Sequence, residues 1–257
     1  MPEPGNDGEW DLIVTPWHLD EHIPDFPVPV GATRVECPVP ARMSALHRAT
    51  ADVVAQAAKP LVLSGDCPTS RAAVAELQRR HDDLTVLWID AHGDFNTPAI
   101  STSGYIGGMA ISMLTGRTPG LFDDTLGLRP VPEASIVLAD ARDLDPAEGD
   151  ALAASQVRRV PAEPAAITAA LGPGPLYVHL DIDVIDGAEL PGARFPSGPG
   201  PSLARIEECL AAACANADVV GAYLACAWLP EHAGDASSRA TMSRLTAALG
   251  ATVTWTG

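Results

Sequence analysis

The 257-residue sequence predicts a doubly wound α/β fold with a mainly parallel sheet. Short apolar runs recur along the chain and end at polar residues or glycine, at 10–16, 60–66, 84–90, 135–140, 176–183 and 219–228. These runs are apolar at nearly every position, which is typical of strands covered on both faces. Helical patterns lie between them, and such alternation indicates a sheet with helices on both sides.

The helical patterns cover residues 41–58, 167–172, 203–215 and 235–249. The third follows Ser202, a candidate N-cap, and the last begins at Asp235, another residue type suited to that position. The last pattern stops at Gly250, a usual helix terminator. No linker, repeat or low-complexity segment interrupts the chain, so we expect a single domain spanning residues 1–257.

The composition favours a cytoplasmic protein that acts on small molecules. Acidic residues outnumber basic residues 33 to 16, and a net charge of −17 repels nucleic acid and anionic membranes. No secretory leader follows Met1, and no apolar run approaches the ~18 residues of a membrane span. The five scattered cysteines suit a reduced compartment. We therefore expect no nucleic-acid or membrane partner, and a charge compatible with cationic or zwitterionic small substrates.

Carboxylates gather at the ends of the predicted strands. The segment DAHGD places Asp90, His92 and Asp94 at alternate positions after an apolar run, and HLDID supplies Asp181 and Asp183. Because residues i and i+2 of a strand point to the same face, we expect Asp181 and Asp183 to point together. Ligands in α/β sheets bind beyond the carboxyl ends of the strands, where these side chains lie.

Four carboxylates on one small patch require protons or a cation, because close like charges raise each other's pKa. Carboxylates with one imidazole suit divalent ions such as Mn²⁺, and this set is large enough to bridge two ions ~3.5–4 Å apart. Taken singly, each residue has an ordinary explanation. A strand-end aspartate is usually a turn former or cap, His179 a core hydrogen-bonder, and Cys67 of SGDCPTS a small buried apolar residue. The joint pattern favours the metal site.

The segments WIDAHGDFNTP (88–98), TSGYIGG (102–108) and HLDIDVID (179–186) resemble motifs of the arginase/ureohydrolase family of binuclear manganese amidinohydrolases. The segment RDLDPAE (142–148) also resembles a family loop that contacts a substrate amino group. The resemblance spans roughly residues 63–230. It implies a three-layer αβα fold with a sheet of about eight strands, two Mn²⁺ ions and a homo-oligomer, either a trimer or a hexamer.

The resemblance also assigns roles to individual residues. The metal-ligand positions are occupied by Cys67, Asp90, His92, Asp94, Asp181 and Asp183. Of these, Asp90 and Asp181 are expected to bridge the ions, and Asp94 also to exchange a proton with the attacking hydroxide. Asn96 and Ser103 match positions that hold a substrate α-carboxylate, and Asp145 matches the carboxylate that receives the α-amino group. These three residues imply a small amino-acid substrate.

Three departures from the family pattern concern the same site. Cys67 replaces a histidine ligand, and because a thiolate matches Mn²⁺ poorly, one metal should be weakly held. Gly107 stands where the family often has a histidine that passes protons to the leaving amine. The guanidinium-binding glutamate is replaced by Cys226, which we assign to the substrate site, or by Ala227 if the register is shifted by one residue. The cysteine at position 67, with GDFNTP, most resembles the Nω-hydroxy-L-arginine amidinohydrolases of cycloserine-type antibiotic pathways.

The best hypothesis from the sequence is a manganese-dependent hydrolase that converts Nω-hydroxy-L-arginine to L-ornithine and hydroxyurea. An N-hydroxyguanidine is less basic than a guanidine, so it has less need of a carboxylate partner. One alternative is another ureohydrolase, acting on arginine, agmatine, a guanidino acid or formiminoglutamate. A second is a non-catalytic relative with a degenerate site, and a third is a guanidine-modifying enzyme with Cys226 as nucleophile. Intact ligand-type residues oppose the second, and Cys226 has no histidine near it in sequence.

Overall fold

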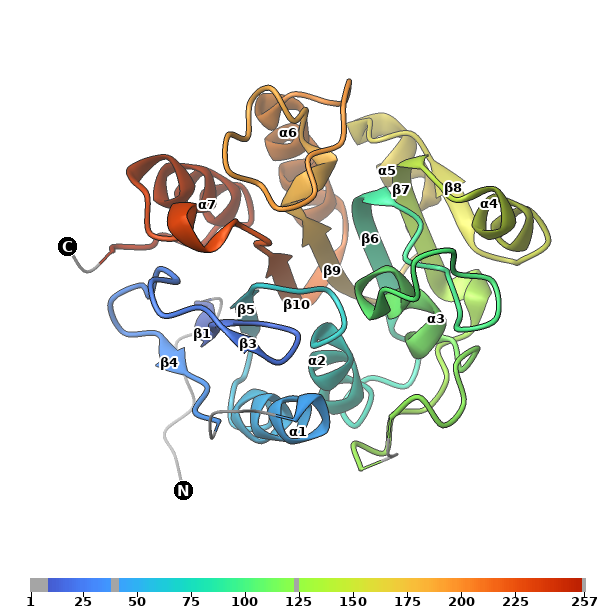
Figure 1. Cartoon of the computed structure of the whole chain (residues 1–257), viewed down its shortest axis with the longest axis horizontal. Helices are drawn as coiled ribbons and strands as arrows, with labels where there is room; N and C mark the ends of the chain where they lie inside the picture. Colours follow the sequence, from blue (N-terminus) through green and yellow to red (C-terminus); the bar gives the residue numbers. More distant parts are fainter. Residues whose placement is uncertain (1–8, 38–41, 123–124, 256–257) are drawn as a thin grey trace.

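The computed structural model describes residues 9–37, 42–122 and 125–255. In this part of the chain an eight-stranded sheet forms the centre of the molecule, and every strand pairs parallel with its neighbours (Figure 1). The strand order is β4 (Thr33–Arg34), β1 (Asp11–Thr15), β5 (Pro60–Ser64), β10 (Asp218–Ala225), β9 (Pro175–Asp181), β6 (Thr85–His92), β7 (Ile136–Asp143) and β8 (Arg158–Val160). A small antiparallel hairpin joins β2 (Trp17–His18) to β3 (Glu21–His22).

Helices cover both faces of the sheet, which confirms the predicted three-layer αβα fold (Figure 1). One face packs against α1 (Met43–Val54), α2 (Ser70–Leu77), α3 (Ala110–Leu114) and α4 (Pro146–Ala153). The other packs against α5 (Pro164–Ala170), α6 (Leu203–Asn216) and α7 (Ala236–Ala248). Short 3₁₀ turns are η1 (Ile106–Met109), η2 (Glu133–Ser135), η3 (Ile182–Val184) and η4 (Pro230–His232).

The strand residues alternate between two cores, as a sheet covered on both faces requires. In β6, Leu87 and Ile89 pack against the layer of α5, α6 and α7, whereas Val86 and Trp88 pack against the opposite layer. The same alternation continues at the end of the strand, where Asp90 follows Trp88 on its face. The buried core therefore determines which polar side chains emerge on which side of the sheet edge.

The six predicted strands and four predicted helices all exist, with shifted boundaries. The first predicted helix was expected to begin at residue 41, which lies outside the described residues, and α1 ends at Val54 rather than at residue 58. Ser202 caps α6 as predicted, because its hydroxyl accepts a hydrogen bond from the Arg205 N–H at 3.2 Å. Asp235 stands at the N-cap of α7, but its carboxylate accepts from the ring of His232 instead of a helix N–H.

The strand order positions the candidate site. Strands β5 and β6 follow one another in the chain but are separated in the sheet by β10 and β9. Such a reversal leaves a crevice beyond the carboxyl ends of the strands, where ligands of α/β proteins bind. In the described part of the chain, no helix combines the length and the apolar character that crossing a membrane requires.

Candidate active site

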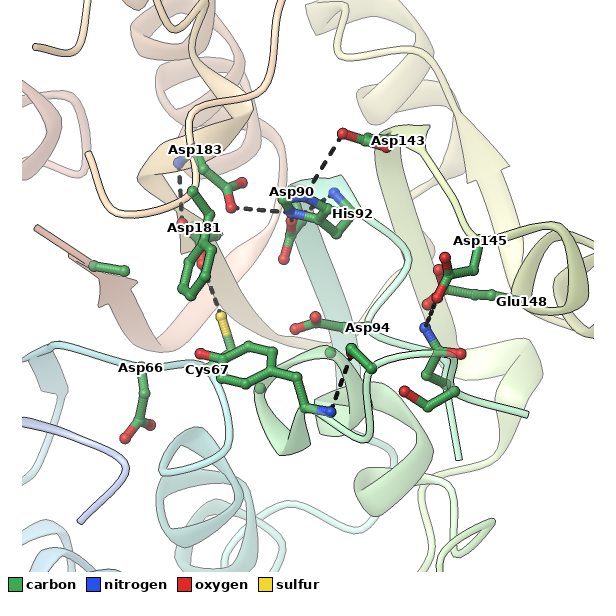
Figure 2. Close-up of a pocket in the computed structure, with 18 of the residues that line it drawn as sticks. Asp66, Cys67, Asp90, His92, Asp94, Asp143, Asp145, Glu148, Asp181 and Asp183 are labelled. Carbon is green, nitrogen blue, oxygen red and sulfur yellow. Dashed lines mark hydrogen bonds and ion pairs between the residues drawn. The ribbon is translucent and has the colours of Figure 1, made fainter. Parts of the chain in front are cut away.

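A pocket of about 190 Å³ opens beyond the carboxyl ends of β5, β6 and β9 (Figure 2). Its lining brings together nine of the ten residues that the sequence assigned to the site: Cys67, Asp90, His92, Asp94, Asn96, Ser103, Asp145, Asp181 and Asp183. The structure does not bring Cys226 into the lining, and Ala227 lies there instead.

The exclusion of Cys226 follows from the strand alternation. Ala225, the last residue of β10, packs in the core of α1 and α2, so Cys226 points to the opposite core, where it is fully buried. Its backbone N–H continues the sheet by donating to the carbonyl of Ser64 at 2.6 Å. The assignment of Cys226 to the substrate site was therefore wrong, and the alternative register with Ala227 is the one observed.

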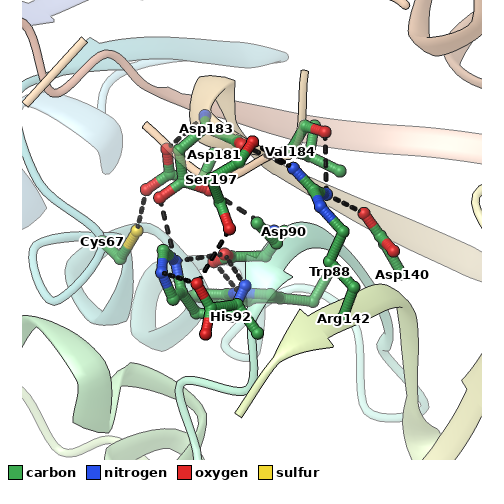
Figure 3. A network of polar contacts seen from close by, with 12 residues as sticks. Cys67, Trp88, Asp90, His92, Asp140, Arg142, Asp181, Asp183, Val184 and Ser197 are labelled. Atoms are coloured by element: carbon green, nitrogen blue, oxygen red, sulfur yellow. Dashed lines mark hydrogen bonds and ion pairs between the residues drawn. The ribbon is translucent and has the colours of Figure 1, made fainter. Parts of the chain in front are cut away.

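The end of β6 forms the first wall. Asp90 is buried, and its carboxylate accepts hydrogen bonds from the indole N–H of Trp88 at 3.0 Å and from the backbone N–H of His92 at 2.7 Å. The His92 Nδ1 lies 3.0 Å from Asp183 Oδ2 and 3.5 Å from Asp90 Oδ1. These contacts hold the imidazole between a carboxylate of β6 and a carboxylate of the turn η3 (Figure 3).

Asp94 lies beyond the strand, in a left-handed conformation with φ of 47°. Aspartate tolerates this region better than most residues, and here it turns the chain into the following loop. The Asp94 carbonyl accepts from the N–H groups of Ile111 and Ser112 in α3, which anchors the turn. The buried Asp94 Oδ2 has no hydrogen-bond partner among the described residues, so this oxygen is available to a ligand.

The end of β9 forms the second wall, by a local structure that differs from the prediction. Strand β9 ends at Asp181, and Asp183 lies in the turn η3, so strand alternation does not explain why the two carboxylates converge. The backbone N–H of Asp183 instead donates to Asp181 Oδ1 at 3.0 Å, which folds the turn back onto the strand. Both side chains still line the pocket.

Cys67 completes this wall from the loop after β5. Its Sγ donates to Asp181 Oδ2 at 2.9 Å, and the thiol is buried (Figure 2). Asp66 also borders the pocket, but its carboxylate is used in local structure, where it accepts from the N–H groups of Leu19 at 2.7 Å and Thr69 at 2.9 Å. The neighbouring Cys67 is therefore the residue of this loop that faces the other acids.

The electrostatics of the pocket show that its acids need a positive partner. Burial, together with the nearby Asp90, raises the pKa of both Asp94 and Asp181 well above the usual range. The same two causes raise the pKa of Asp183 to about 7, although His92 opposes them. Burial lowers the pKa of His92, but its contacts with Asp183 and Asp90 outweigh burial and raise the pKa to about 12. The site without a metal thus retains protons that a divalent cation can replace.

The donor atoms fit a divalent cation. One oxygen each from Asp90 and Asp183 and a ring nitrogen of His92 lie within 4.8 Å of one another. A second group, again within 4.8 Å, combines Asp90 with Cys67 and His179. Oxygen-rich sets with an imidazole suit hard or borderline ions, whereas a thiolate favours softer ones.

His179, which belongs to the second group, has surroundings that differ from the expectation. Its ring stacks on Trp88 with centroids 3.4 Å apart and planes at 3°, and neither ring nitrogen has a hydrogen-bond partner among the described residues. The predicted role as a core hydrogen-bonder is therefore not observed. Burial lowers the pKa of His179 to about 3, so the ring is neutral at physiological pH.

A third wall carries the residues assigned to an amino-acid substrate. Asp145 begins α4 and accepts hydrogen bonds from the Thr102 hydroxyl at 3.1 Å and from the Asn96 amide at 3.4 Å. The Ser103 hydroxyl accepts from the backbone N–H of Tyr105 at 3.1 Å. Asn96 and Thr102 both contact the Asp145 carboxylate, and Ser103 lines the same pocket, which is a polar arrangement suited to a zwitterion.

Sequence reasoning did not assign several residues that line the pocket, among them His18, Tyr105, Glu148 and Phe195. Glu148 is buried, and its Oε1 accepts from the Phe95 N–H at 2.8 Å, which joins α4 to the loop after Asp94. Its place in RDLDPAE was a usable signal. His18 lies in β2 and Phe195 in the loop after η3, and neither was identified from the sequence.

Comparison with known proteins shows what the chain is similar to. The sequence model of the arginase family matches residues 17–255. An Nω-hydroxy-L-arginine amidinohydrolase of Streptomyces lavendulae is 34% identical over 149 residues, which are 56% of this chain and 53% of that protein. An arginase of Staphylococcus aureus is 40% identical over 89 residues, 35% of this chain and 29% of that one. The chain thus matches about half the length of the first relative and less than a third of the second.

Among solved structures, an arginase from Bacillus cereus superposes with a TM-score of 0.76 over 94% of this chain and 97% of that one, at 20% sequence identity. At that identity the superposition shows a shared fold. It agrees with the central eight-stranded parallel sheet and its two helical layers.

Proposed function

The chain belongs to the arginase family, and from this premise we propose that it is a metal-dependent amidinohydrolase that cleaves a C–N bond of a guanidino-type amino acid. The observation that carries the proposal is the convergence of four buried carboxylates and one imidazole on a pocket with an opposite polar wall. The carboxylates and the imidazole suit divalent cations, and the polar wall suits an α-amino acid. The same premise and donor set support Mn²⁺ as the cofactor.

Two Mn²⁺ ions would be held by the six candidate ligands Cys67, Asp90, His92, Asp94, Asp181 and Asp183. When bound, they supply a water whose pKa is low enough for attack on carbon near neutral pH. The protein's own groups do the rest. Asn96 and Ser103 bind the substrate carboxylate, and Asp145 binds the α-amino group, so the guanidino carbon is directed toward the acids.

Asp94 is the proposed proton carrier. Its Oδ2 is buried and unpartnered among the described residues, so this oxygen can accept a proton from the attacking water. The water oxygen bonds to the guanidino carbon, the bond from that carbon to the chain nitrogen breaks, and Asp94 returns the proton to the departing amine. The products are an amino acid with a free amine, such as L-ornithine, and a urea.

We propose Nω-hydroxy-L-arginine as the substrate, with hydroxyurea as the second product. Ala227 lines the pocket, and we align it with the guanidinium-binding glutamate of the family, so no carboxylate at that position neutralises a full cation. An N-hydroxyguanidine is less basic and binds there with a smaller electrostatic penalty. The similarity to an enzyme named for this substrate supports the choice.

The test is release of L-ornithine by the purified protein with excess Mn²⁺, from L-arginine and from Nω-hydroxy-L-arginine in parallel. We expect kcat/KM at least about tenfold higher for the hydroxylated substrate, which corresponds to roughly 1.4 kcal/mol of transition-state discrimination. Asp94→Asn provides the inactive control, since it keeps the shape of the side chain and removes the proton acceptor. Equal or better turnover of arginine would remove the hydroxyarginine assignment, and no release from either would retire both amino-acid substrates.

A further inference from the structure

One wall of the pocket is aromatic and is not used by the mechanism above. It consists of His18, Tyr105 and Phe195, whose rings are mutual neighbours. The centroids of Tyr105 and Phe195 are 5.2 Å apart, and those of His18 and Phe195 are 5.9 Å apart. The rings come from the β2–β3 hairpin, the loop before η1 and the loop after η3, so only the folded chain assembles them.

Tyr105 fills the space that a side chain at position 107 would occupy. A Cβ atom built on Gly107 would lie 2.1 Å from Tyr105 Cε1 and 2.5 Å from its hydroxyl oxygen, which is closer than real contacts allow. Glycine at 107 and the observed position of Tyr105 therefore depend on each other. Gly107 replaces the histidine of the family pattern, and the absence of a side chain at this position leaves room for Tyr105.

The hydrogen bonds of His18 determine the direction of the tyrosine hydroxyl. The His18 Nδ1 lies 2.7 Å from the carbonyl oxygen of Gly65, and a carbonyl only accepts, so Nδ1 carries the proton. In the neutral ring Nε2 is then an acceptor, and it lies 3.0 Å from the Tyr105 hydroxyl. The hydroxyl therefore donates to His18, and its oxygen keeps a lone pair for a donor in the pocket.

Ala227 lines the same pocket. Its side chain is a single methyl group, so it occupies less of the pocket than a glutamate side chain would. The Tyr105 oxygen is the polar acceptor of the aromatic wall, since Phe195 has none and both His18 nitrogens are engaged. A neutral acceptor suits a hydroxyl donor better than it suits a cation, which requires an ionised partner.

We propose that Tyr105, oriented by His18, accepts a hydrogen bond from the hydroxyl of an N-hydroxyguanidino substrate and is the residue that selects this substrate over an unsubstituted guanidine. The inference rests on the proposed function and deepens it, because it names the group that binds the additional hydroxyl of the substrate. His18 acts through Tyr105 and is a positioning residue.

The experiment compares the wild type with Tyr105→Phe, which keeps the ring and its packing but removes the acceptor. We expect KM for Nω-hydroxy-L-arginine to rise about 3–10-fold with kcat nearly unchanged, the range for loss of one hydrogen bond. KM for arginine should not change, so the preference falls by the same factor. His18→Phe should shift KM in the same direction, and His18→Gln, which restores an acceptor, should recover part of the loss.

The two proposals fail differently. If the wild type releases ornithine but Tyr105→Phe leaves the preference unchanged, the role of Tyr105 is wrong and the proposed function stands. If the wild type acts on neither substrate, both are wrong. The steric premise has a test without activity: Gly107→Ala should lower Tm, Gly108→Ala should not because its Cβ would meet nothing within 4 Å, and Tyr105→Ala should relieve the effect of Gly107→Ala.

Discussion

At the scale of single residues, Cys67 is the candidate ligand that we expect to weaken metal binding. The thiol faces the acids and donates to Asp181, and burial together with the charges of Asp181, Asp94 and Asp90 raises its pKa well above the usual range. A metal must therefore displace a proton that the surroundings hold tightly, and the resulting thiolate is a poor match for Mn²⁺.

Replacing Cys67 with histidine should raise the affinity for Mn²⁺ by roughly tenfold or more, because a neutral imidazole is a better ligand for that ion. The measurement is metal content after dialysis against a series of free Mn²⁺ concentrations. The matched control is Cys226→Ala, which alters a cysteine outside the pocket lining and should leave occupancy unchanged. Unchanged occupancy in Cys67→His would show that position 67 is not a ligand.

His47 is a buried residue far from this chemistry, with a predictable effect on stability. Burial, and then the charge of Arg71, lowers its pKa from 6.5 to about 3. Between these values the unfolded chain binds a proton that the folded protein does not, so the contribution of His47 to stability is lost as the pH falls. Neither ring nitrogen has a hydrogen-bond partner among the described residues.

His47→Leu should therefore stabilise the protein by about 1 kcal/mol at neutral pH, since it removes two unsatisfied polar atoms. The gain should increase from pH 6.5 toward pH 3, where the wild type must bury a histidine that favours its charged form. Urea unfolding at several pH values measures the difference between the two proteins. A stability gain that does not change with pH would show that the pKa of His47 is not lowered in the folded protein.

Residue types at the strand ends were readable from the sequence, but their side-chain directions were not. Asp90 and His92 were expected in the pocket and lie there, because the apolar run of β6 fixes the strand that carries them. Cys226 was misplaced by one residue, since a run that is apolar throughout gives no alternation from which to read the register. His18 and Phe195 could not be found, because contacts between segments that are distant in the sequence leave no local pattern.

At the scale of elements, Arg142 joins three segments that shape the site. Its guanidinium bonds the Asp140 carboxylate, the carbonyls of Asp183 and Val184 at 3.3 and 3.0 Å, and the Ser197 carbonyl at 2.8 Å (Figure 3). The end of β7 is thereby tied to η3 and to the loop after η3 that contains Ser197. The planar, five-donor guanidinium is the side chain able to satisfy several acceptors at once.

Arg142→Lys should lower the free energy of unfolding by about 2–3 kcal/mol, because a lysine leaves buried carbonyls without donors. It should also weaken metal binding, since η3 carries Asp183. Arg205→Lys is the control: this arginine is more exposed and its side chain forms ion pairs with Glu163 and Glu208 at the surface, so its loss should cost less than about 1 kcal/mol. Equal losses of unfolding free energy in the two variants would show that the hydrogen bonds of Arg142 do not hold these segments together.

The elements themselves were only partly predictable. Long apolar runs and amphipathic helices such as α1 and α6 were identified, because their periodicity is set by one buried face. Helix α2 was missed since seven of its eight residues are buried, which removes the polar face that a helical pattern needs. Strands β4 and β8, with two and three residues, are too short to carry a pattern.

At the scale of the whole molecule, the site brings together like charges that a bound metal would offset. Four buried aspartates converge within a chain of net charge −17. A cation that binds the folded state but not the unfolded chain stabilises it by mass action, about 2.7 kcal/mol at a hundredfold excess over Kd. We therefore expect metal binding and folding to be coupled in this protein.

Adding excess Mn²⁺ to chelator-treated protein should raise Tm by about 5–10 °C, given 2–4 °C for each kcal/mol in a chain of this size. Calorimetry with and without Mn²⁺ measures the shift, and Asp183→Asn should reduce it. Mg²⁺ at the same concentration controls for general ionic effects. An equal rise with Mg²⁺, or none with Mn²⁺, would speak against a built metal site.

The two outermost strands of the sheet have a consequence for assembly. With two residues in β4 and three in β8, each rim of the sheet exposes very few unpaired backbone N–H and C=O groups. A strand from another chain has little to pair with there, so the sheet resists growth by edge-to-edge addition and the aggregation that follows from it. Copies of this protein that associate must do so through side chains of their helices and loops.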